Sequence, residues 1–412
     1  MWVQLYSVKL LHTADWHLGK RLDRFSRLDE QRDAMEELCR IADEHDVDCV
    51  LIAGDVYDCP NPPDDAEDLF YKTVHRLSRN GKRAVVVIAG NHDSPRGLET
   101  SDPLARECGI FLLGYPDTVV ECCKTTDGVE VLRADKGFIE LALAGCAYPL
   151  RLLVTPYANE QRLKTFLGTG HGDEELRQLL QTRWQTLADK YCDNQGVNVL
   201  MAHLYITKKG VELEEPDDER PIRIGNAQAI YTENLPTKIQ YAALGHLHNY
   251  IPVDKEPCPV VYSSSPLKYT FDKSPLDKYC MIVTAEPNKP VTTERIELQS
   301  GKKLFHQKFE SVDEGIVWLE KYQDAWVLLT IVTDDFLTEQ DRRRLHAAHQ
   351  GIVDIIPESR NILTSAGSVA QIDLSQDMET LFTQFFTHRL GQAPNEDLIS
   401  LFKEVLSEGR ND

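Results

Sequence analysis

Five short segments of the chain combine aspartate, asparagine and histidine, the residue types that bind divalent metal ions through oxygen and nitrogen. Seven of their side chains form the set of expected metal ligands: Asp15, His17, Asp55, Asn91, His203, His246 and His248. A set of this size exceeds the four ligands of one tetrahedral zinc ion, and it contains no thiolate. The composition of the set therefore predicts a site for two divalent ions.

The chemistry expected of such a site is the hydrolysis of phosphate esters. Two ions about 3.5–4 Å apart neutralise phosphate oxygens and lower the pKa of a water toward ~7. Mixed imidazole and carboxylate ligands suit manganese, iron or zinc better than calcium. Asp55 is the expected bridge between the ions, because Gly54 lets the backbone approach closely. His92, beside the ligand Asn91, is free to steady the transition state or protonate the leaving oxygen, and Asp93 is placed to orient it.

The five segments each follow an apolar run that is expected to be a strand. These runs span residues 9–13, 49–53, 84–89, 197–201 and 241–244. Amphipathic helical patterns at 28–45 and 64–80 separate the first three runs, which predicts βαβ units with strands buried on both faces. Sites in such folds form outside the carboxyl ends of the strands, so we expect the five segments at one sheet edge. Further strands are expected at 260–262, 327–332 and 352–356, and a helix at 173–190, whereas residues 114–155 look irregular. Residues 212–219 are expected to form an acidic, solvated surface loop, and residues 361–370 a linker of small residues.

Each segment has a purely structural interpretation when it is taken alone. An Asp-x-His triplet arises by chance, and Gly-Asp after a strand is often only a turn. The occurrence of all five segments at predicted strand ends favours the metal site. His12 lies inside the first strand and is expected in the core. The basic residues that follow the first segment either contact phosphates of DNA or form a solvated loop: Lys20, Arg21, Arg24 and Arg27.

The composition limits the class of protein. A length of 412 residues predicts two or three domains. No apolar run approaches the ~20 residues of a membrane span, and the first residues lack a signal-peptide pattern, so we expect a cytoplasmic protein. Ten cysteines without a C-x-x-C pair are typical of reduced thiols. A net charge of −21 argues against DNA binding by overall charge, so DNA contacts would depend on basic segments, metal ions or a partner.

The motifs resemble those of the calcineurin-like metallophosphoesterases, and more closely those of the SbcD family, the nuclease subunits of bacterial SbcCD complexes. The resemblance is carried by residues 11–19, 53–58, 89–94 and 245–248, and by Ser265-Pro266 with Phe271. It covers residues 8–280 well and is looser beyond them. Two positions depart from the wider pattern. Asp58 stands where archaeal and eukaryotic relatives have a second active-site histidine, which puts a role for Asp58 beyond structure in doubt, and Ser264 stands where a glycine is usual.

The resemblance implies an α/β fold of calcineurin-like type, a β-sandwich flanked by helices, with a smaller α+β capping domain and C-terminal helices. It divides the chain into a metallophosphoesterase domain (1–285), a cap (286–360), and a linker with a helical ATPase-binding tail (361–412). Two amphipathic helices, at 375–390 and 395–407, are expected in the tail. The resemblance also implies that the seven ligands above hold two ions, with manganese expected and magnesium as the alternative, and that His92 is the catalytic histidine.

The function implied by the resemblance is that of a metal-dependent DNA nuclease subunit. It would act as a double-strand exonuclease and a single-strand or hairpin endonuclease in DNA end processing, repair, recombination and replication. The implied partners are an SbcC-type coiled-coil ATPase and a second copy of this chain, together in a heterotetramer. The two copies of this chain would contact each other near residues 64–80. An ATPase that holds the DNA would explain the acidic charge. The alternatives are a two-metal phosphodiesterase or phosphatase for small molecules or phosphoproteins, and a non-catalytic scaffold.

Overall fold

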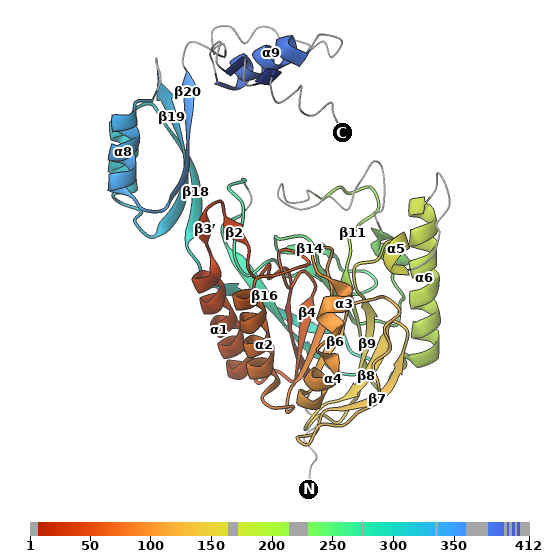
Figure 1. Ribbon diagram of the computed structural model, residues 1–412. Helices are drawn as coiled ribbons and strands as arrows, with labels where there is room; N and C mark the ends of the chain where they lie inside the picture. The colour runs from red at the N-terminus through yellow and green to blue at the C-terminus, as the bar shows by residue number, and fades with distance from the viewer. Residues whose placement is uncertain are drawn as a thin grey trace. The chain divides into compact units, whose positions relative to one another are not determined.

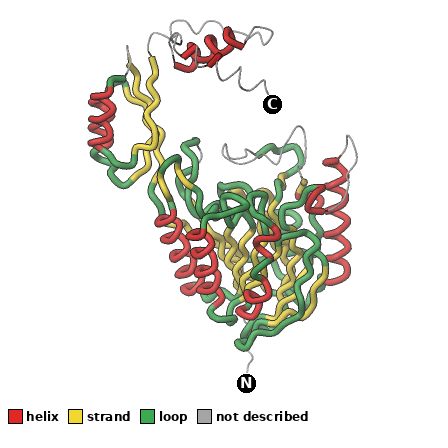
Figure 2. The backbone as a smooth tube through the Cα atoms, viewed as in Figure 1, coloured by secondary structure: helices red, strands yellow, loops and turns green. Residues whose placement is uncertain are grey.

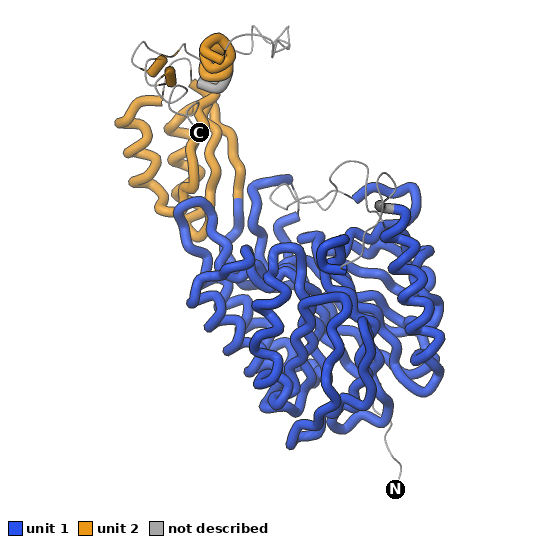
Figure 3. The backbone as a smooth tube through the Cα atoms, turned by 45° about the vertical axis from the view of Figure 1, so that its right-hand side comes forward, with its two compact units in different colours: residues 1–304 blue, residues 305–412 orange. Residues whose placement is uncertain are grey.

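The structure is a computed structural model, and it describes residues 7–163, 172–213, 230–273, 275–333, 337–359, 378–390, 394, 398–399 and 402–403. The chain forms two compact units, residues 1–304 and 305–412 (Figure 3). The predicted domain boundary at 285 falls between two paired strands, β16 (Lys278–Ala285) and β17 (Thr292–Leu298). Because β17 continues the sheet of the first unit, we propose to end the first domain after Leu304.

The first unit contains a six-stranded sheet in the order β17-β16-β1-β4-β5-β6. Its parallel part consists of β1 (Val8–Thr13), β4 (Cys49–Ala53), β5 (Ala84–Ile88) and β6 (Ile110–Leu113). Every residue of β4 and β5 is buried. These continuous apolar runs therefore form strands that are covered on both faces, as predicted.

A second sheet of seven strands has the order β14-β15-β13-β10-β9-β8-β7. Its strands are β7 (Glu130–Asp135), β8 (Phe138–Ala142), β9 (Leu150–Thr155), β10 (Val197–His203), β13 (Tyr241–Gly245), β14 (Ile251–Asp254) and β15 (Val260–Tyr262). The expectation of an irregular stretch at 114–155 was wrong, because it contains β7, β8 and β9. The apolar pattern is interrupted there by Glu140 and Arg151, which are buried opposite each other and form an ion pair of 3.0 Å.

The two sheets pack face to face and helices cover their outer faces (Figures 1 and 2). Apolar side chains of both sheets, such as Val86 and Met201, fill the space between them. Helices α1 (Leu28–Glu44) and α2 (Asp64–Ser78) pack on the first sheet, and α6 (Gly172–Tyr191) packs on the second. This order of layers confirms the predicted sandwich flanked by helices.

Short elements connect these layers. They are β2 (Arg21–Leu22), β3 (Phe25–Ser26), α3 (Pro95–Glu99), α4 (Asp102–Ala105), η1 (Arg106–Cys108), α5 (Glu160–Leu163), β11 (Ile206–Thr207), β12 (Ile230–Tyr231) and η2 (Thr232–Asn234). Strands β2 and β3 form a small antiparallel hairpin. No helix among the described residues is long and apolar enough to cross a membrane.

The second unit is built on a three-stranded sheet in the order β18-β19-β20. Its elements are β18 (Lys303–Phe309), α7 (Val312–Leu319), β19 (Ala325–Thr333), α8 (Glu339–Ala348) and β20 (Ile352–Ser359). Both helices contribute to one core with the sheet, through Leu319 and Leu345 packed near Ile331. The predicted strands at 327–332 and 352–356 are present within β19 and β20.

The C-terminal predictions fall partly outside the described residues. Helix α9 (Met378–Leu390) covers most of the helix predicted at 375–390. The predicted linker at 361–370, most of the helix at 395–407, and residues 214–219 of the acidic loop lie outside the described part. Where the last segment is described, the Phe402 ring stacks on Phe382 with 4.0 Å between centroids.

Candidate metal centre

The five predicted segments converge from both sheets of the sandwich. Three of them follow β1, β4 and β5 of the first sheet, and two follow β10 and β13 of the second. We had expected one sheet edge, but the edges of two facing sheets meet. The His203 Nδ1 atom lies 2.8 Å from the Ala53 carbonyl oxygen, and the His246 N–H donates to Asp15 Oδ1 over 2.8 Å. These contacts join the sheets at their carboxyl ends.

Asp55 occupies the centre of the cluster. Its Oδ2 atom lies 3.2 Å from His203 Nε2 and 3.9 Å from His17 Nε2. The Nε2 atom of His17 is 2.9 Å from that of His248, and Asn91 Oδ1 is 2.9 Å from His203 Nε2. One carboxylate oxygen therefore faces a histidine from each sheet, which is the placement expected of a residue that bridges two ions.

Six of the seven predicted ligands, together with His92, belong to three overlapping groups of side chains that could hold a metal ion. Within each of three groups the candidate ligand atoms lie within 4.8 Å of one another. The groups are Asp15 with His17 and His248, Asp55 with His203 and His246, and His17 with Asp55 and His92. Asn91 adjoins the second group through His203. The cluster thus contains two adjacent sets of donors, with His92 beside them.

The burial of these donors fits a site for cations. Asp15, Asp55 and His203 have no exposed surface. Among the described residues, Asp15 Oδ2 has no hydrogen-bond partner although it is buried. A buried carboxylate oxygen without a partner costs free energy unless a positive charge compensates it. The oxygen and nitrogen donors collected here would satisfy divalent ions of the manganese, iron or zinc type.

Four of the predicted ligands have unusual backbone conformations. The φ angle is 56° at Asp15, 46° at His17, 46° at Asp55 and 110° at His246. Residues with a Cβ atom adopt such angles rarely, at a cost of about 1–3 kcal/mol each. Backbone hydrogen bonds of 3.0 Å from Asp15 to Gly54 and from His17 to Asp55 hold the first two turns. Strain concentrated at one cluster is typical of a functional site.

Glycines allow the ligands to approach closely. A Cβ atom at Gly90 would lie 2.0 Å from Asp55 Oδ1, and one at Gly54 would lie 2.2 Å from His203 Nδ1. At Gly245 it would lie 1.9 Å from the Ala53 carbonyl oxygen. The position of Gly54 agrees with the predicted close approach of the backbone next to Asp55.

The charges of the cluster are strongly coupled. Burial by itself lowers the pKa of His203, but the Asp55 and Asp15 carboxylates outweigh it and raise that pKa to about 9. Burial raises the pKa of Asp15, and the neighbouring histidines oppose this effect. The carboxylates therefore hold a proton on His203 at neutral pH in the absence of another cation. A metal ion must displace that proton, so its binding would release protons.

Both the main chain and the imidazole ring of His92 make polar contacts. Its main-chain N–H donates to Asp55 Oδ1 over 2.9 Å, and its Nδ1 atom lies 2.8 Å from the Asp58 carbonyl oxygen. A carbonyl accepts only, so Nδ1 carries the proton and donates it in this contact. The neutral ring then has its basic nitrogen at Nε2. His92 also packs edge-on against His17 with 4.9 Å between centroids.

The expected role of Asp93 needs correction. Its carboxylate accepts hydrogen bonds from the backbone N–H groups of Val56, Tyr57 and Gly90 over 2.8–3.1 Å. Both oxygens are used in tying the loop after β5 to the loop after β4. The atom that orients the His92 ring is instead the backbone carbonyl of Asp58, which no sequence motif could indicate.

The basic segment after the first motif is largely used within the protein. Arg27 is buried and forms a two-point ion pair with Glu30 over 2.7 and 2.8 Å, so the predicted DNA contact at Arg27 is wrong. The Lys20 ammonium lies 3.3 Å from Asp58 Oδ1. Arg21 and Arg24 are exposed on the β2–β3 hairpin.

Of the two departures from the wider pattern, Asp58 contacts the cluster directly, whereas Ser264 precedes Ser265, whose N–H donates to the His248 carbonyl oxygen over 3.1 Å. The Asp58 carboxylate is 3.6 Å from His17 Nδ1, so this residue faces one histidine with its side chain and another with its carbonyl. Ser264 has a φ of 88°, a conformation that favours glycine. Its hydroxyl oxygen accepts a hydrogen bond of 2.9 Å from the Tyr279 N–H.

Sequence reasoning missed Arg162, whose guanidinium contacts the loop that carries Asn91 and His92. It donates to the carbonyl oxygens of Gly90 and Asp93 over 2.7 and 2.9 Å. Arg162 lies in a stretch without a recognisable motif, so no signal in the sequence could have found it.

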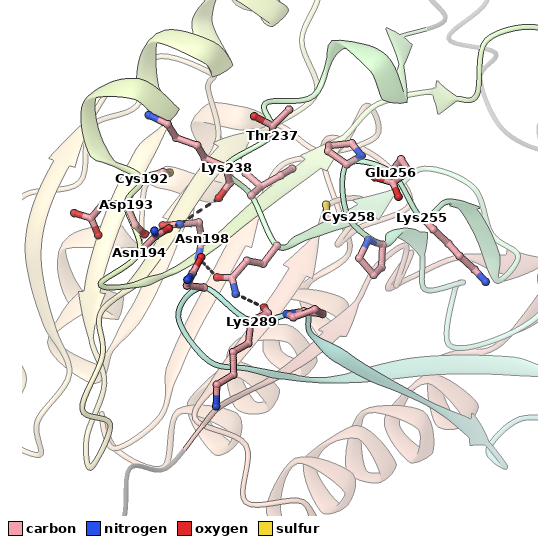
Figure 4. Close-up of a pocket in the computed structure, with 16 residues that line it drawn as sticks. Cys192, Asp193, Asn194, Asn198, Thr237, Lys238, Lys255, Glu256, Cys258 and Lys289 are labelled. Atoms are coloured by element: carbon pink, nitrogen blue, oxygen red, sulfur yellow. Dashed lines mark hydrogen bonds between the residues drawn. The ribbon is translucent and has the colours of Figure 1, made fainter.

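A large cavity lies away from the metal cluster. It has a volume of about 770 Å³ and is lined by residues that precede β10 and β13, among them Asn194, Lys238 and Gln240 (Figure 4). The metal cluster lies at the opposite, carboxyl ends of these strands. None of the predicted site residues lines this cavity.

Comparison with known families agrees with this fold and site. The model of the calcineurin-like phosphoesterase family matches residues 8–250, which include all the predicted ligands and His92. The sandwich and its buried Asp, Asn and His cluster thus define a phosphoesterase of the calcineurin-like class.

Similarity to individual proteins identifies the family to which the chain belongs within this class. The chain is 36% identical to SbcD, the nuclease subunit of SbcCD, from Bacillus subtilis (strain 168), over 97% of this chain and 98% of the relative. It is 32% identical to SbcD of Rhodobacter capsulatus, over 63% and 62% of the two chains. For SbcD of Escherichia coli K12 the identity is 26%, over 91% and 89%. The chain therefore belongs to the SbcD family of calcineurin-like phosphoesterases.

Proposed function

We propose that this chain is a metal-dependent nuclease subunit that hydrolyses phosphodiester bonds of DNA. The observation that carries the proposal is the placement of Asp55 Oδ2 between His203 and His17, inside a buried cluster of donors from both sheets. The family supports the same conclusion, since relatives that match nearly the whole chain are named nucleases.

The proposed ligands divide between two ions. Asp15, His17 and His248 would hold one ion, and Asn91, His203 and His246 the other, with Asp55 between them. When bound, such ions polarise the phosphate and lower the pKa of a water. Manganese is the ion that we expect, with magnesium as the alternative.

His92 is the proposed catalytic residue. The Asp58 carbonyl fixes its Nδ1–H, so Nε2 is the nitrogen that accepts or delivers a proton. Once Nε2 has taken up a proton, the imidazolium can steady negative charge on the phosphate or protonate the leaving oxygen. Asp93 has no proposed chemical step, because its carboxylate holds backbone N–H groups.

The proposed substrates are double-stranded DNA ends and hairpins, and the proposed partner is an SbcC-type coiled-coil ATPase. The net charge of −21 supports a partner that supplies most of the DNA-binding surface. Arg21 and Arg24 are the remaining candidates for direct phosphate contacts. We also propose that residues 305–359 form the cap, and that the C-terminal tail binds the ATPase through α9, where Met378 and Phe385 are more than half exposed.

We further propose that the chain forms a homodimer within a heterotetramer and acts in the cytoplasm. The proposal of a dimer rests on the family alone. All ten cysteines are free thiols, which is typical of a reducing compartment such as the cytoplasm.

The test compares wild-type chain with His92→Gln, each assembled with its ATPase partner, on hairpin DNA with Mn²⁺. Loss of a proton-transfer group is expected to lower kcat by about 10²–10⁴-fold. Mn²⁺ affinity, measured by calorimetry on the isolated chain, should stay within about twofold of wild type, because His92 is not among the proposed ligands. The control His346→Gln alters an exposed histidine of α8 and should leave both quantities unchanged.

Two results would contradict the proposal. One is wild-type complex that binds Mn²⁺ but leaves every DNA substrate intact. The other is rapid hydrolysis of a cyclic nucleotide or a phosphopeptide while DNA remains uncut, which would favour the phosphodiesterase or phosphatase alternative.

A further inference from the structure

Arg162 connects the two sheets next to the proposed metal centre. It lies in α5, shortly after β9 of the second sheet. The loop that it contacts, residues 90–93, follows β5 of the first sheet. A side chain from the helix that follows β9 of the second sheet therefore contacts the loop of the first sheet that carries Asn91 and His92.

The contact is a two-point clamp on the backbone of that loop. Nη1 donates to the Gly90 carbonyl oxygen over 2.7 Å, and Nη2 donates to the Asp93 carbonyl oxygen over 2.9 Å. These two carbonyls flank Asn91 and His92 on either side. A charged donor makes a hydrogen bond roughly twice as strong as a neutral one. The planar guanidinium also fixes the separation of the two carbonyls, which an ammonium group cannot do.

Arg162 is itself held in place by contacts with neighbouring residues of its own segment. Its backbone N–H donates to Asn159 Oδ1 over 2.9 Å, and its guanidinium lies over the Tyr157 ring, 4.9 Å from the centroid. The Tyr157 N–H in turn donates to the Ala89 carbonyl oxygen over 2.8 Å. Arg162 and Tyr157 thus together bind three parts of the same loop region, at Ala89, Gly90 and Asp93.

The clamped loop has little freedom to compensate for a shift. The Asn91 Oδ1 atom lies 2.9 Å from His203 Nε2, and the His92 N–H lies 2.9 Å from Asp55 Oδ1. We propose that Arg162 is a positioning residue, which sets the Asn91 amide as a metal ligand and the His92 ring toward substrate. This inference rests on the proposed function, because it assumes that Asn91 and His92 serve the metal centre.

Arg83 provides a matched control. It is a buried arginine that donates to the backbone carbonyls of Val47, Leu77 and Ala42 over 2.7–3.0 Å. It precedes β5, whereas the loop held by Arg162 follows β5. Removal of Arg83 therefore deletes the same chemistry at the opposite end of the strand, away from the metal centre.

The experiment measures Mn²⁺ affinity by calorimetry on the full-length chain, together with thermal unfolding. Arg162→Ala should weaken Mn²⁺ binding about 10–100-fold, the effect typical of residues that orient metal ligands. Arg162→Lys, which can reach one carbonyl at a time, should lie between Arg162→Ala and wild type. In complex with the ATPase, kcat on hairpin DNA should fall in the same order while KM stays constant. Arg83→Ala should lower the unfolding temperature but keep the wild-type Mn²⁺ affinity.

The outcomes separate this inference from the proposed function. Wild type that binds Mn²⁺ but cuts no DNA refutes the nuclease proposal, while the affinities of the Arg162 variants still decide the present inference. Wild-type Mn²⁺ affinity in both Arg162→Ala and Arg162→Lys would overturn it. So would an equal loss of affinity in Arg83→Ala, since the effect would then be one of general stability. If Arg162→Ala fails to fold, the comparison of Arg162→Lys with Arg83→Lys decides.

Discussion

Gly90→Ala should damage the proposed metal centre without removing any ligand. A Cβ atom at this position would lie 2.0 Å from Asp55 Oδ1 and 2.4 Å from the Asp55 backbone nitrogen. Because real Cβ contacts do not fall below 3.0 Å, the carboxylate must retreat by about 1 Å or the loop must move. Asp55 cannot retreat freely, since its Oδ1 accepts from the His92 N–H and its Oδ2 faces His203.

The size of the expected loss of activity and of Mn²⁺ affinity follows from this displacement. A shift of about 1 Å in a positioned group costs on the order of 10²-fold in rate. We expect kcat on hairpin DNA to fall about 100-fold, and Mn²⁺ affinity to fall by at least about tenfold. Overpacking of the buried site should also lower the free energy of unfolding by about 1–3 kcal/mol.

The assay combines calorimetric Mn²⁺ titration, urea unfolding and single-turnover DNA cleavage. The control is Gly315→Ala in α7, where the added methyl would make ordinary contacts of 3.4–3.6 Å. That variant should be as active as wild type and up to about 1 kcal/mol more stable, because alanine favours the helix. Wild-type Mn²⁺ affinity and kcat in Gly90→Ala would refute the reasoning about the close approach at Asp55.

Two further predictions concern stability. Burial lowers the pKa of His12 to about 3, while its unfolded value stays near 6.5. Between these two pH values the unfolded chain binds this proton and the folded chain does not. The free energy of unfolding should therefore fall by up to about 1.4 kcal/mol per pH unit below 6.5. Urea titrations at several pH values measure this dependence, and the same dependence on pH in His12→Gln as in wild type would contradict the prediction. Ser264→Gly relieves a φ of 88° but loses the hydroxyl that accepts from Tyr279, so its stability should lie within about 1 kcal/mol of wild type. Ser264→Ala keeps the strain and loses the bond, and thermal unfolding should place it about 1–2 kcal/mol below Ser264→Gly.

Several elements could be predicted because local physics decides them. The run at 49–53 matches β4, and the helical pattern at 64–80 matches α2 within two residues. Both have an uninterrupted period, since every residue of β4 is buried and α2 has a single apolar face. The order of the five segments with Asp, Asn and His at strand ends was visible for the same reason.

Other features depend on residues that balance each other in space. Strands β8 and β9 were missed because Glu140 and Arg151, charged in sequence, neutralise each other when the strands pair. Arg27 looked like part of a basic surface, but its ion pair with Glu30 allows its burial. Asp93 looked like a partner for His92, whereas its carboxylate faces backbone N–H groups. Each error arose because a charged residue met its partner only in the folded chain.

The sequence by itself determined the donor types, their order and the strands that deliver them, because motifs and hydrophobic periods are local properties of the chain. Only the tertiary structure decided that two sheets meet at their carboxyl ends, that Asp55 lies between histidines of both, and that Arg162 clamps the loop of His92. These facts depend on distances between residues far apart in the chain, and packing between the sheets sets such distances.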